Sequence, residues 1–246
     1  MAPNVNNTDS STIADKAFGE LYIAVREKEG RVYKDKQVAN LPDIDHDHTY
    51  YKEWKMRKRS AGRLVKFLQK MPGPINILEV GCGNGWLSSK LAEIPNAKVT
   101  GLDPNLNEIE QASRVFKNSN LKFIYGSFSL TTFQEEEKFN IVLFAASLQY
   151  FASIKEVIGT AFKLLSPLGR VHVIDTHFYE EENAEKAKIK SARYYINLGF
   201  PQMTAYYFHH QLQQISRFKH KIMFHPTNLW NRISGQGVFY WIRLKP

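Results

Sequence analysis

The 246-residue sequence predicts an α/β fold in which helices cover both faces of a mainly parallel sheet. Short apolar runs alternate with helical stretches between residues 75 and 175. A glycine-rich turn follows the first apolar run, and an acidic residue ends the second. Because the carboxyl ends of parallel strands form the ligand-binding edge of such sheets, both features predict a ligand site at that edge.

Each predicted strand is a short apolar run, and each predicted helix repeats apolar residues every three or four positions. The predicted strands cover residues 75–80, 98–102, 121–125, 139–145, 170–175, 219–224 and 238–244. One helix follows the first strand and is stopped by Pro95, and two more begin at capping boxes formed by Asn105 with Glu108 and by Ser153 with Glu156. A further helix is expected over residues 208–218.

The stretch ILEVGCGNG, residues 77–85, places Gly81, Gly83 and Gly85 at alternate positions. Glycine lets the backbone pass close beneath a ligand, because no Cβ stands in the way. The following helix directs its free N–H groups to the same place. Asp103 ends the second strand, where a carboxylate can accept both ribose hydroxyl protons. Together these residues predict a nucleoside-binding protein.

The spacing of the glycines separates two cofactors. Folds that bind NAD prefer G-x-G-x-x-G, with the pyrophosphate on the helix N-terminus. Here the pattern is G-x-G-x-G, and Glu79 precedes it by two residues. An acid at that place repels a pyrophosphate but suits the ammonium group of S-adenosylmethionine (SAM). The motif resembles the first motif of the class I SAM-dependent methyltransferases, and this resemblance implies SAM as the cofactor.

The resemblance also implies the architecture. It predicts a Rossmann-like, seven-stranded, mostly parallel sheet with an antiparallel last strand, formed by a methyltransferase domain over residues 49–246. Residues 1–48 are expected to be an N-terminal tail and lead-in, of which the first dozen residues form a disordered tail. A cap helix over residues 49–70 and an insertion over residues 178–206 are expected to enclose the site. The alternative for both segments is ordinary core or surface packing.

Further contacts follow from the same resemblance. In the cap helix, Tyr50, Tyr51 or Trp54 can present a ring to the sulfonium. Gln149 and Tyr150, after the fourth strand, are expected at the acceptor. The remaining predicted cofactor contacts are Cys82, as a small packing residue in the glycine loop, Pro104 and Phe128 against the adenine, Ser127 as its hydrogen-bond partner, and Ala145.

The segment after the fourth strand, AASLQYF, resembles the small-molecule branch of the family. It has no Asn/Asp-Pro-Pro-aromatic loop, which is typical of exocyclic amino methylation of bases. The single thiol, Cys82, lies in the glycine loop rather than here, so carbon-5 pyrimidine methylation is also disfavoured. His177, at the tip of the fifth strand, is the predicted general base, with His209 and His210 as alternatives.

The composition indicates the cellular compartment and the charge of possible binding partners. A net charge of +9 and a pI near 9.4 are compatible with an anionic small-molecule acceptor, although the basic runs are also explained as solvated faces. One cysteine and no apolar run of about 20 residues predict a cytoplasmic protein without a membrane span. The acids and histidines of PDIDHDH lie outside the predicted sheet, so no metal site is predicted.

These observations predict a SAM-dependent methyltransferase that moves a methyl group to an oxygen or nitrogen atom of a small-molecule acceptor by in-line displacement. Two alternatives remain open at this point. One is an RNA or protein methyltransferase that uses the basic surface. The other is a non-catalytic SAM-binding module that has kept the fold and lost the chemistry.

Overall fold

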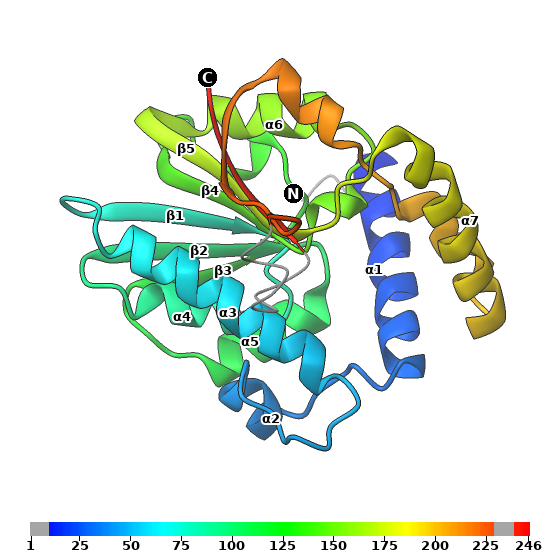
Figure 1. Cartoon of the computed structure of the whole chain (residues 1–246). Helices are drawn as coiled ribbons and strands as arrows, with labels where there is room; N and C mark the ends of the chain where they lie inside the picture. Colours follow the sequence, from blue (N-terminus) through cyan, green and yellow to red (C-terminus); the bar gives the residue numbers. More distant parts are fainter. Residues whose placement is uncertain (1–9, 229–238) are drawn as a thin grey trace, which may run out of the picture.

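The computed structural model describes residues 10–228 and 239–246. Its centre is a seven-stranded sheet in the order β3-β2-β1-β4-β5-β7-β6 (Figure 1). Neighbouring strands from β3 to β5 are parallel, whereas β7 is antiparallel to both β5 and β6. The strands are β1 (Ile75–Val80), β2 (Ala97–Asp103), β3 (Leu121–Tyr125), β4 (Phe139–Ala145), β5 (Leu165–Thr176), β6 (Lys219–Phe224) and β7 (Tyr240–Lys245). The predicted Rossmann-like fold with an antiparallel last strand is confirmed.

Helices cover both faces of this sheet. On one face lie α3 (Tyr51–Leu68), α4 (Trp86–Ala92) and α5 (Leu106–Val115), and on the other lie α6 (Ile154–Lys163) and the 3-10 helix η4 (Leu212–Arg217). Successive side chains of a strand point to opposite faces. Ile77 of β1 accordingly joins the core cluster under α3 and α4, and Leu78 joins the cluster under α6.

Two strands differ from their predicted bounds by more than one residue at an end, whereas β2 is longer by one residue at each end. The fifth strand was expected to begin at Arg170, because Pro167 and Gly169 read as breakers, but β5 already begins at Leu165. A register shift between Phe139 and Ile141 of β4 accommodates the extra residues. The last strand was expected from residue 238, which lies outside the described residues, and β7 begins at Tyr240.

The predicted helix over residues 208–218 is wrong in its first half. Tyr179 forms a parallel bridge with Gln211, and the Tyr179 N–H donates to the His210 carbonyl at 2.9 Å. This pairing holds the backbone extended, so the segment becomes helical only at η4. The two short 3-10 helices η1 (Leu130–Thr132) and η2 (Leu148–Tyr150) follow β3 and β4.

The N-terminal part contains two helices that the sequence analysis missed, α1 (Ser10–Lys28) and α2 (Asp35–Asn40). The expected disordered tail therefore overlaps the start of α1, and residues 1–9 lie outside the described residues. Helix α1 packs beside α7 (Glu181–Leu198) and the 3-10 helix η3 (Pro201–Tyr206), at the edge where the parallel strands end (Figure 1). Within residues 10–228 and 239–246, no helix is both long and apolar enough to cross a membrane.

Candidate active site

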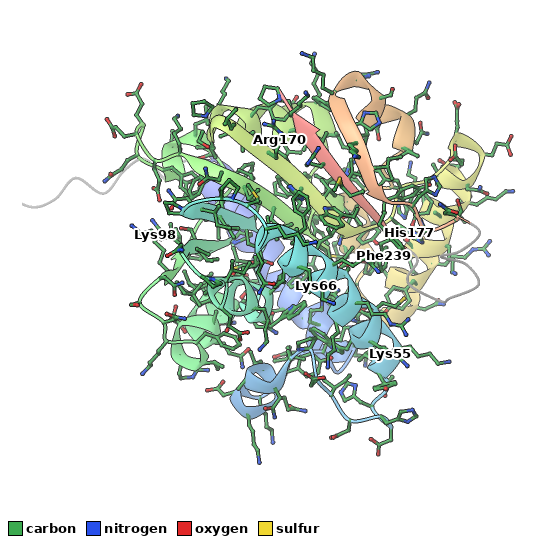
Figure 2. All side chains as sticks on the ribbon, turned by 60° about the vertical axis from the view of Figure 1, so that its left-hand side comes forward. Lys55, Lys66, Lys98, Arg170, His177 and Phe239 are labelled. Carbon is green, nitrogen blue, oxygen red and sulfur yellow. The ribbon has the colours of Figure 1, made fainter. Side chains whose placement is uncertain are left out.

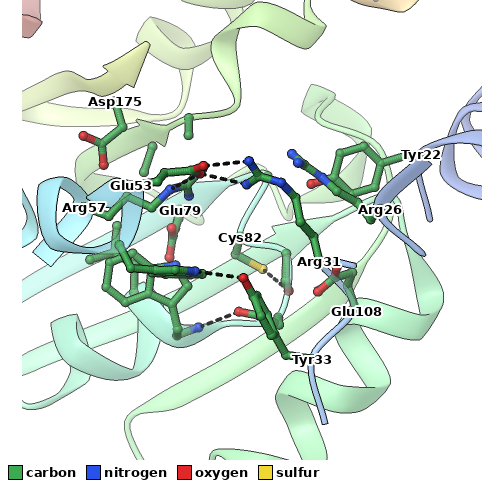
Figure 3. Close-up of a pocket in the computed structure, with 18 residues that line it drawn as sticks. Tyr22, Arg26, Arg31, Tyr33, Glu53, Arg57, Glu79, Cys82, Glu108 and Asp175 are labelled. Atoms are coloured by element: carbon green, nitrogen blue, oxygen red, sulfur yellow. Dashed lines mark hydrogen bonds and ion pairs between the residues drawn. The ribbon is translucent and has the colours of Figure 1, made fainter. Parts of the chain in front are cut away.

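A pocket opens at the carboxyl ends of β1 and β4, between the glycine loop, α3 and α1 (Figure 3). The order of strands reverses between β1 and β4, and ligands of open α/β sheets bind at such a switch point. The cavity measures about 100 Å³. Six of the predicted cofactor contacts line it, namely Trp54, Glu79, Gly81, Cys82, Gly83 and Ala145.

The glycine loop forms the floor of the pocket, and two of its glycines have no room for a side chain. Gly81 has φ +73°, and a Cβ there would lie 2.5 Å from the Ser147 Cβ. Gly85 has φ +77° and caps α4, and its Cβ would lie 2.5 Å from Phe123. The loop therefore requires glycine for both its backbone conformation and its close packing.

Asp103 is oriented by the backbone around it. One carboxylate oxygen accepts the N–H of Gly83 at 2.8 Å, and the other accepts the N–H of Asn105 at 2.9 Å. Burial raises the pKa of Asp103 to about 6, although both hydrogen bonds act to lower it. Each oxygen retains a lone pair, so Asp103 can accept further hydrogen bonds from a ligand.

Glu79 is buried beneath the loop at the end of β1. The Ser88 hydroxyl donates a hydrogen bond to its carboxylate. Burial raises the pKa of Glu79 to about 8, and the nearby Asp103 acts in the same direction. A cation bound beside this buried carboxyl group would stabilise its ionised form and lower its pKa.

The opposite wall of the pocket is basic, and sequence reasoning did not find it. Arg31, which follows α1, donates to both oxygens of Glu53 at 3.0 and 2.7 Å. Arg57 of α3 donates to the same carboxylate at 3.1 Å. Burial alone would raise the pKa of Glu53, but these two arginines lower it to about 2. Arg26 of α1 lines the same wall and pairs with Glu29 at 3.0 Å.

Two residues at the strand tips adopt a left-handed backbone without being glycine. Ala146, after β4, and Asp175, at the end of β5, both have φ +55°. Asp175 lines the pocket and accepts the Ser60 hydroxyl at 2.6 Å. Burial raises its pKa, although Arg57 opposes the shift. Strained conformations of this kind are concentrated at functional sites.

The predicted base does not lie in this pocket. His177 is exposed, and its ring contacts Tyr179 and Phe239, with centroids 5.2 and 5.3 Å away (Figure 2). Asp175, the residue before the last one of β5, lines the pocket, whereas His177 follows the end of the strand and is exposed. The alternatives also lie outside the residues described as lining the pocket: His209 accepts or donates a hydrogen bond with Ser191, and buried His210 contacts the Leu148 carbonyl.

Several other predicted contacts also lie away from the described lining of the pocket. Tyr51 stacks near His46 beside a separate hollow, in contrast to Trp54 one turn further along α3. Pro104 lines a second hollow with Gly19 and Tyr125. Phe128 packs against Phe144 and Phe151 in the core, and the Ser127 carbonyl accepts the Thr132 hydroxyl.

The two residues predicted at the acceptor lie at the edge of the same region. The Gln149 side chain donates to the Ala146 carbonyl at 2.5 Å. The Tyr150 hydroxyl accepts a hydrogen bond from Arg26 at 3.4 Å, and its ring contacts Tyr22 and Phe18 of α1. Among the residues that the structure describes, no group of three or more His, Cys, Asp or Glu could hold a metal ion.

The switch-point position of the pocket and its glycine loop are typical of α/β proteins that bind a nucleoside, whereas Asp103 and Gly85 lie beside the pocket and not in its described lining. A family model described as a methyltransferase domain matches residues 74–233, which is more than half of the chain. The chain therefore belongs to this methyltransferase family.

Individual relatives agree with this assignment. A malonyl-[acyl-carrier protein] O-methyltransferase of Acetivibrio thermocellus is 27% identical over 168 residues, which cover 63% of this chain and 58% of that protein. A sterol 24-C-methyltransferase of Kluyveromyces lactis is 31% identical over 130 residues, covering 50% of this chain and 34% of that protein. The chain spans about half the length of the curated relatives it matches.

Solved structures share the fold. The plantazolicin methyltransferase BpumL, in complex with a triazolic desmethylPZN analog and S-adenosylhomocysteine (SAH), has a TM-score of 0.58 at 16% identity, covering 96% of this chain and 97% of that one. YcgJ from Bacillus subtilis has a TM-score of 0.57 at 13% identity, covering 76% and 98%. The SAH bound in the BpumL structures agrees with the SAM cofactor that the sequence predicts.

Proposed function

We propose that this protein transfers the methyl group of SAM to an oxygen or nitrogen atom of a small-molecule acceptor that carries a negative charge. The observation that carries this proposal is the basic wall, in which Arg26, Arg31 and Arg57 face the glycine loop across one pocket (Figure 3). Two relatives are named for a malonyl group on an acyl-carrier protein and for a sterol, which supports an acceptor group of metabolite size.

The charge of the pocket favours an anion. Of the four carboxyl groups among its described lining residues, only Glu53 has a lowered pKa. Burial raises the pKa of Glu79 to about 8 and contributes most to raising that of Glu108 to about 7, so the negative charge of these two groups at neutral pH is reduced. Burial also raises the pKa of Asp175. The guanidinium groups are fixed donors that suit carboxylate or phosphate oxygens.

We further propose how the chain holds the cofactor. Asp103 accepts the ribose hydroxyls, Glu79 pairs with the ammonium group, and the glycine loop lies against the nucleoside. The cavity of about 100 Å³ is small, since pockets for ligands of this size typically measure about 300–1,000 Å³. Helix α1 is held over the site by the Asn105 amide, which donates to the Gly19 carbonyl at 2.9 Å. We propose that α1 moves outward when SAM enters.

SAM supplies a methyl group on a positively charged sulfur, which is already activated for in-line displacement. The protein then has to orient the acceptor and exclude water, and such orientation supplies about 7–11 kcal/mol. The basic wall positions the anionic group of the acceptor, and α1 closes over the site. A carboxylate acceptor needs no base, whereas a hydroxyl or ammonium acceptor must lose a proton. Asp175, held by Ser60, is the carboxyl group in the pocket that can take this proton.

The test measures SAH formation from SAM with a panel of small carboxylic acids, phosphate esters, phenols and amines. We expect turnover with an anionic acceptor, and Arg57→Gln should reduce its kcat/KM at least tenfold while SAH affinity changes less than about twofold. The matched control is Arg59→Gln, an exposed arginine of the same helix.

Three results would contradict the proposal in different ways. Loss of SAH binding in Arg57→Gln would assign this arginine to the cofactor. Methyl transfer to RNA or to a protein, with strongly salt-dependent binding, would favour the basic-surface alternative. SAH binding without turnover of any acceptor would favour a non-catalytic binding module.

A further inference from the structure

The start of α5 shows an incomplete capping box that leaves one carboxyl group free. The Asn105 side chain accepts the Glu108 N–H at 3.2 Å, as the sequence predicts. In a complete capping box the Glu108 carboxylate would accept the Asn105 N–H in return. Asp103 takes that N–H instead, at 2.9 Å. The Glu108 side chain is thereby released from its capping role.

The released carboxyl group faces the pocket. Glu108 lines the cavity, and its Oε2 is buried without a hydrogen-bond partner among the described residues (Figure 3). It faces Gly83, because a Cβ on that glycine would lie 3.7 Å from Oε2. The Gly83 N–H is bound on its other side by Asp103. Two carboxyl groups therefore flank the same point of the glycine loop.

A buried acceptor without a donor is costly, so its presence in a ligand pocket indicates a donor on the ligand. We propose that Glu108 is a second ribose-binding carboxylate, which accepts a hydrogen bond from one hydroxyl of SAM while Asp103 binds the other. A vicinal diol presents two adjacent donors and carries no charge, which fits two neighbouring acceptors. The inference rests on the proposed placement of the ribose at Asp103, and it is independent of the acceptor.

The surroundings of Glu108 make this contact sensitive to pH. The pKa of Glu108 is raised to about 7, mainly by burial and also by the nearby Asp103, while Arg26 opposes the shift. Asp103 has a pKa of about 6, and the Tyr22 phenol and Cys82 thiol, which both sense the Glu108 charge, have raised pKa values. The ionised carboxylate is the stronger acceptor, so SAH affinity rises with pH as Glu108 ionises.

The experiment compares three ligands by calorimetry, namely SAH and its 2′-deoxy and 3′-deoxy analogues, with the full-length protein. Glu108→Gln should weaken SAH binding about tenfold. The affinity for the analogue that lacks the hydroxyl bound by Glu108 should fall by less than twofold in the same variant. Glu110→Gln, an exposed glutamate of the same helix, is the matched control and should bind all three ligands like the unmodified protein.

Between pH 6 and pH 8 the SAH affinity of the unmodified protein should rise several-fold more than that of Glu108→Gln. Equal weakening of all three ligands would show a merely structural role and would overturn the proposal, as would unchanged SAH affinity in a folded variant. Asp103→Asn, measured in parallel, separates two failures. If Asp103→Asn binds SAH normally, the proposed placement of the ribose is wrong. If Asp103→Asn binds SAH weakly and Glu108→Gln binds it normally, only the proposed role of Glu108 is wrong.

Discussion

Glu79 links the stability of the empty protein to its affinity for the cofactor. Its side chain is 2% exposed, and burial raises its pKa from 4.5 to about 8. At about 1.4 kcal/mol for each tenfold change in an equilibrium constant, keeping this carboxylate ionised above pH 8 costs the folded state up to about 5 kcal/mol. Glu79→Gln removes the charge and keeps an acceptor for the Ser88 hydroxyl. The variant should therefore be more stable than the unmodified protein at high pH.

The sign of the pH dependence follows from proton binding. A carboxyl group with a raised pKa keeps its proton in the folded state, while the unfolded state loses it above pH 4.5. The free energy of unfolding therefore falls as the pH rises from 4.5 to about 8. The Glu79→Gln variant does not undergo this loss, because the titrating carboxyl group is absent. If only 1–2 kcal/mol of the cost is realised, the variant should melt about 3–8 °C higher at pH 9.

Thermal unfolding of the ligand-free protein at pH 5 and pH 9 tests this reasoning. At pH 5 the two proteins should melt within about 2 °C of one another, since less than about 1 kcal/mol separates them there. Glu135→Gln, an exposed glutamate, is the control and should show no pH-dependent difference. SAH should bind the Glu79→Gln variant about tenfold more weakly, because the proposed ammonium contact is lost. A lower melting temperature than that of the unmodified protein at pH 9 would refute the argument.

Three further outcomes are expected. Gly85→Ala should lower the melting temperature by more than about 5 °C, because its Cβ would lie 2.5 Å from Phe123 at φ +77°, whereas Gly62→Ala, which meets nothing within 4 Å, should be neutral or stabilising. SAH at a hundredfold its dissociation constant should stabilise the unmodified protein by about 2.7 kcal/mol, or about 5–10 °C, and this gain should disappear in Asp103→Ala. His177→Ala should keep kcat within about twofold, and a loss above tenfold would return this residue to the mechanism.

The positions of the glycine loop and Asp103 could be predicted from the sequence because their determinants are local. The glycine loop immediately follows β1, and Asp103 ends the neighbouring strand, paired with β1 along its length. Backbone conformation at Gly81 and Gly85 is encoded by the residue type itself. The two helices predicted to begin at Asn105 and Ser153 are confirmed for the same reason, since these side-chain oxygens accept the capping N–H groups.

The acceptor side depends on contacts between residues far apart in the chain. Phe18, Tyr22 and Val25 recur at helical spacing, so a signal for α1 was present. That signal says nothing of where the helix lies, which is fixed by packing against Tyr150 and Met203.

The basic character of the pocket depends on tertiary packing. Arg26 and Arg31 line the pocket because α1 and the chain after it lie over the strand ends. His177 illustrates the converse, because its place after β5 was correct in sequence but the chain turns it outward (Figure 2). For Glu108, one feature could be predicted from the sequence and another could not. Its helix cap was predicted, but its availability to a ligand depends on Asp103 competing for the Asn105 N–H. The residues that choose the acceptor can therefore be sought on α1 and α3, while the residues that hold SAM can be sought in the glycine loop and at the end of β2.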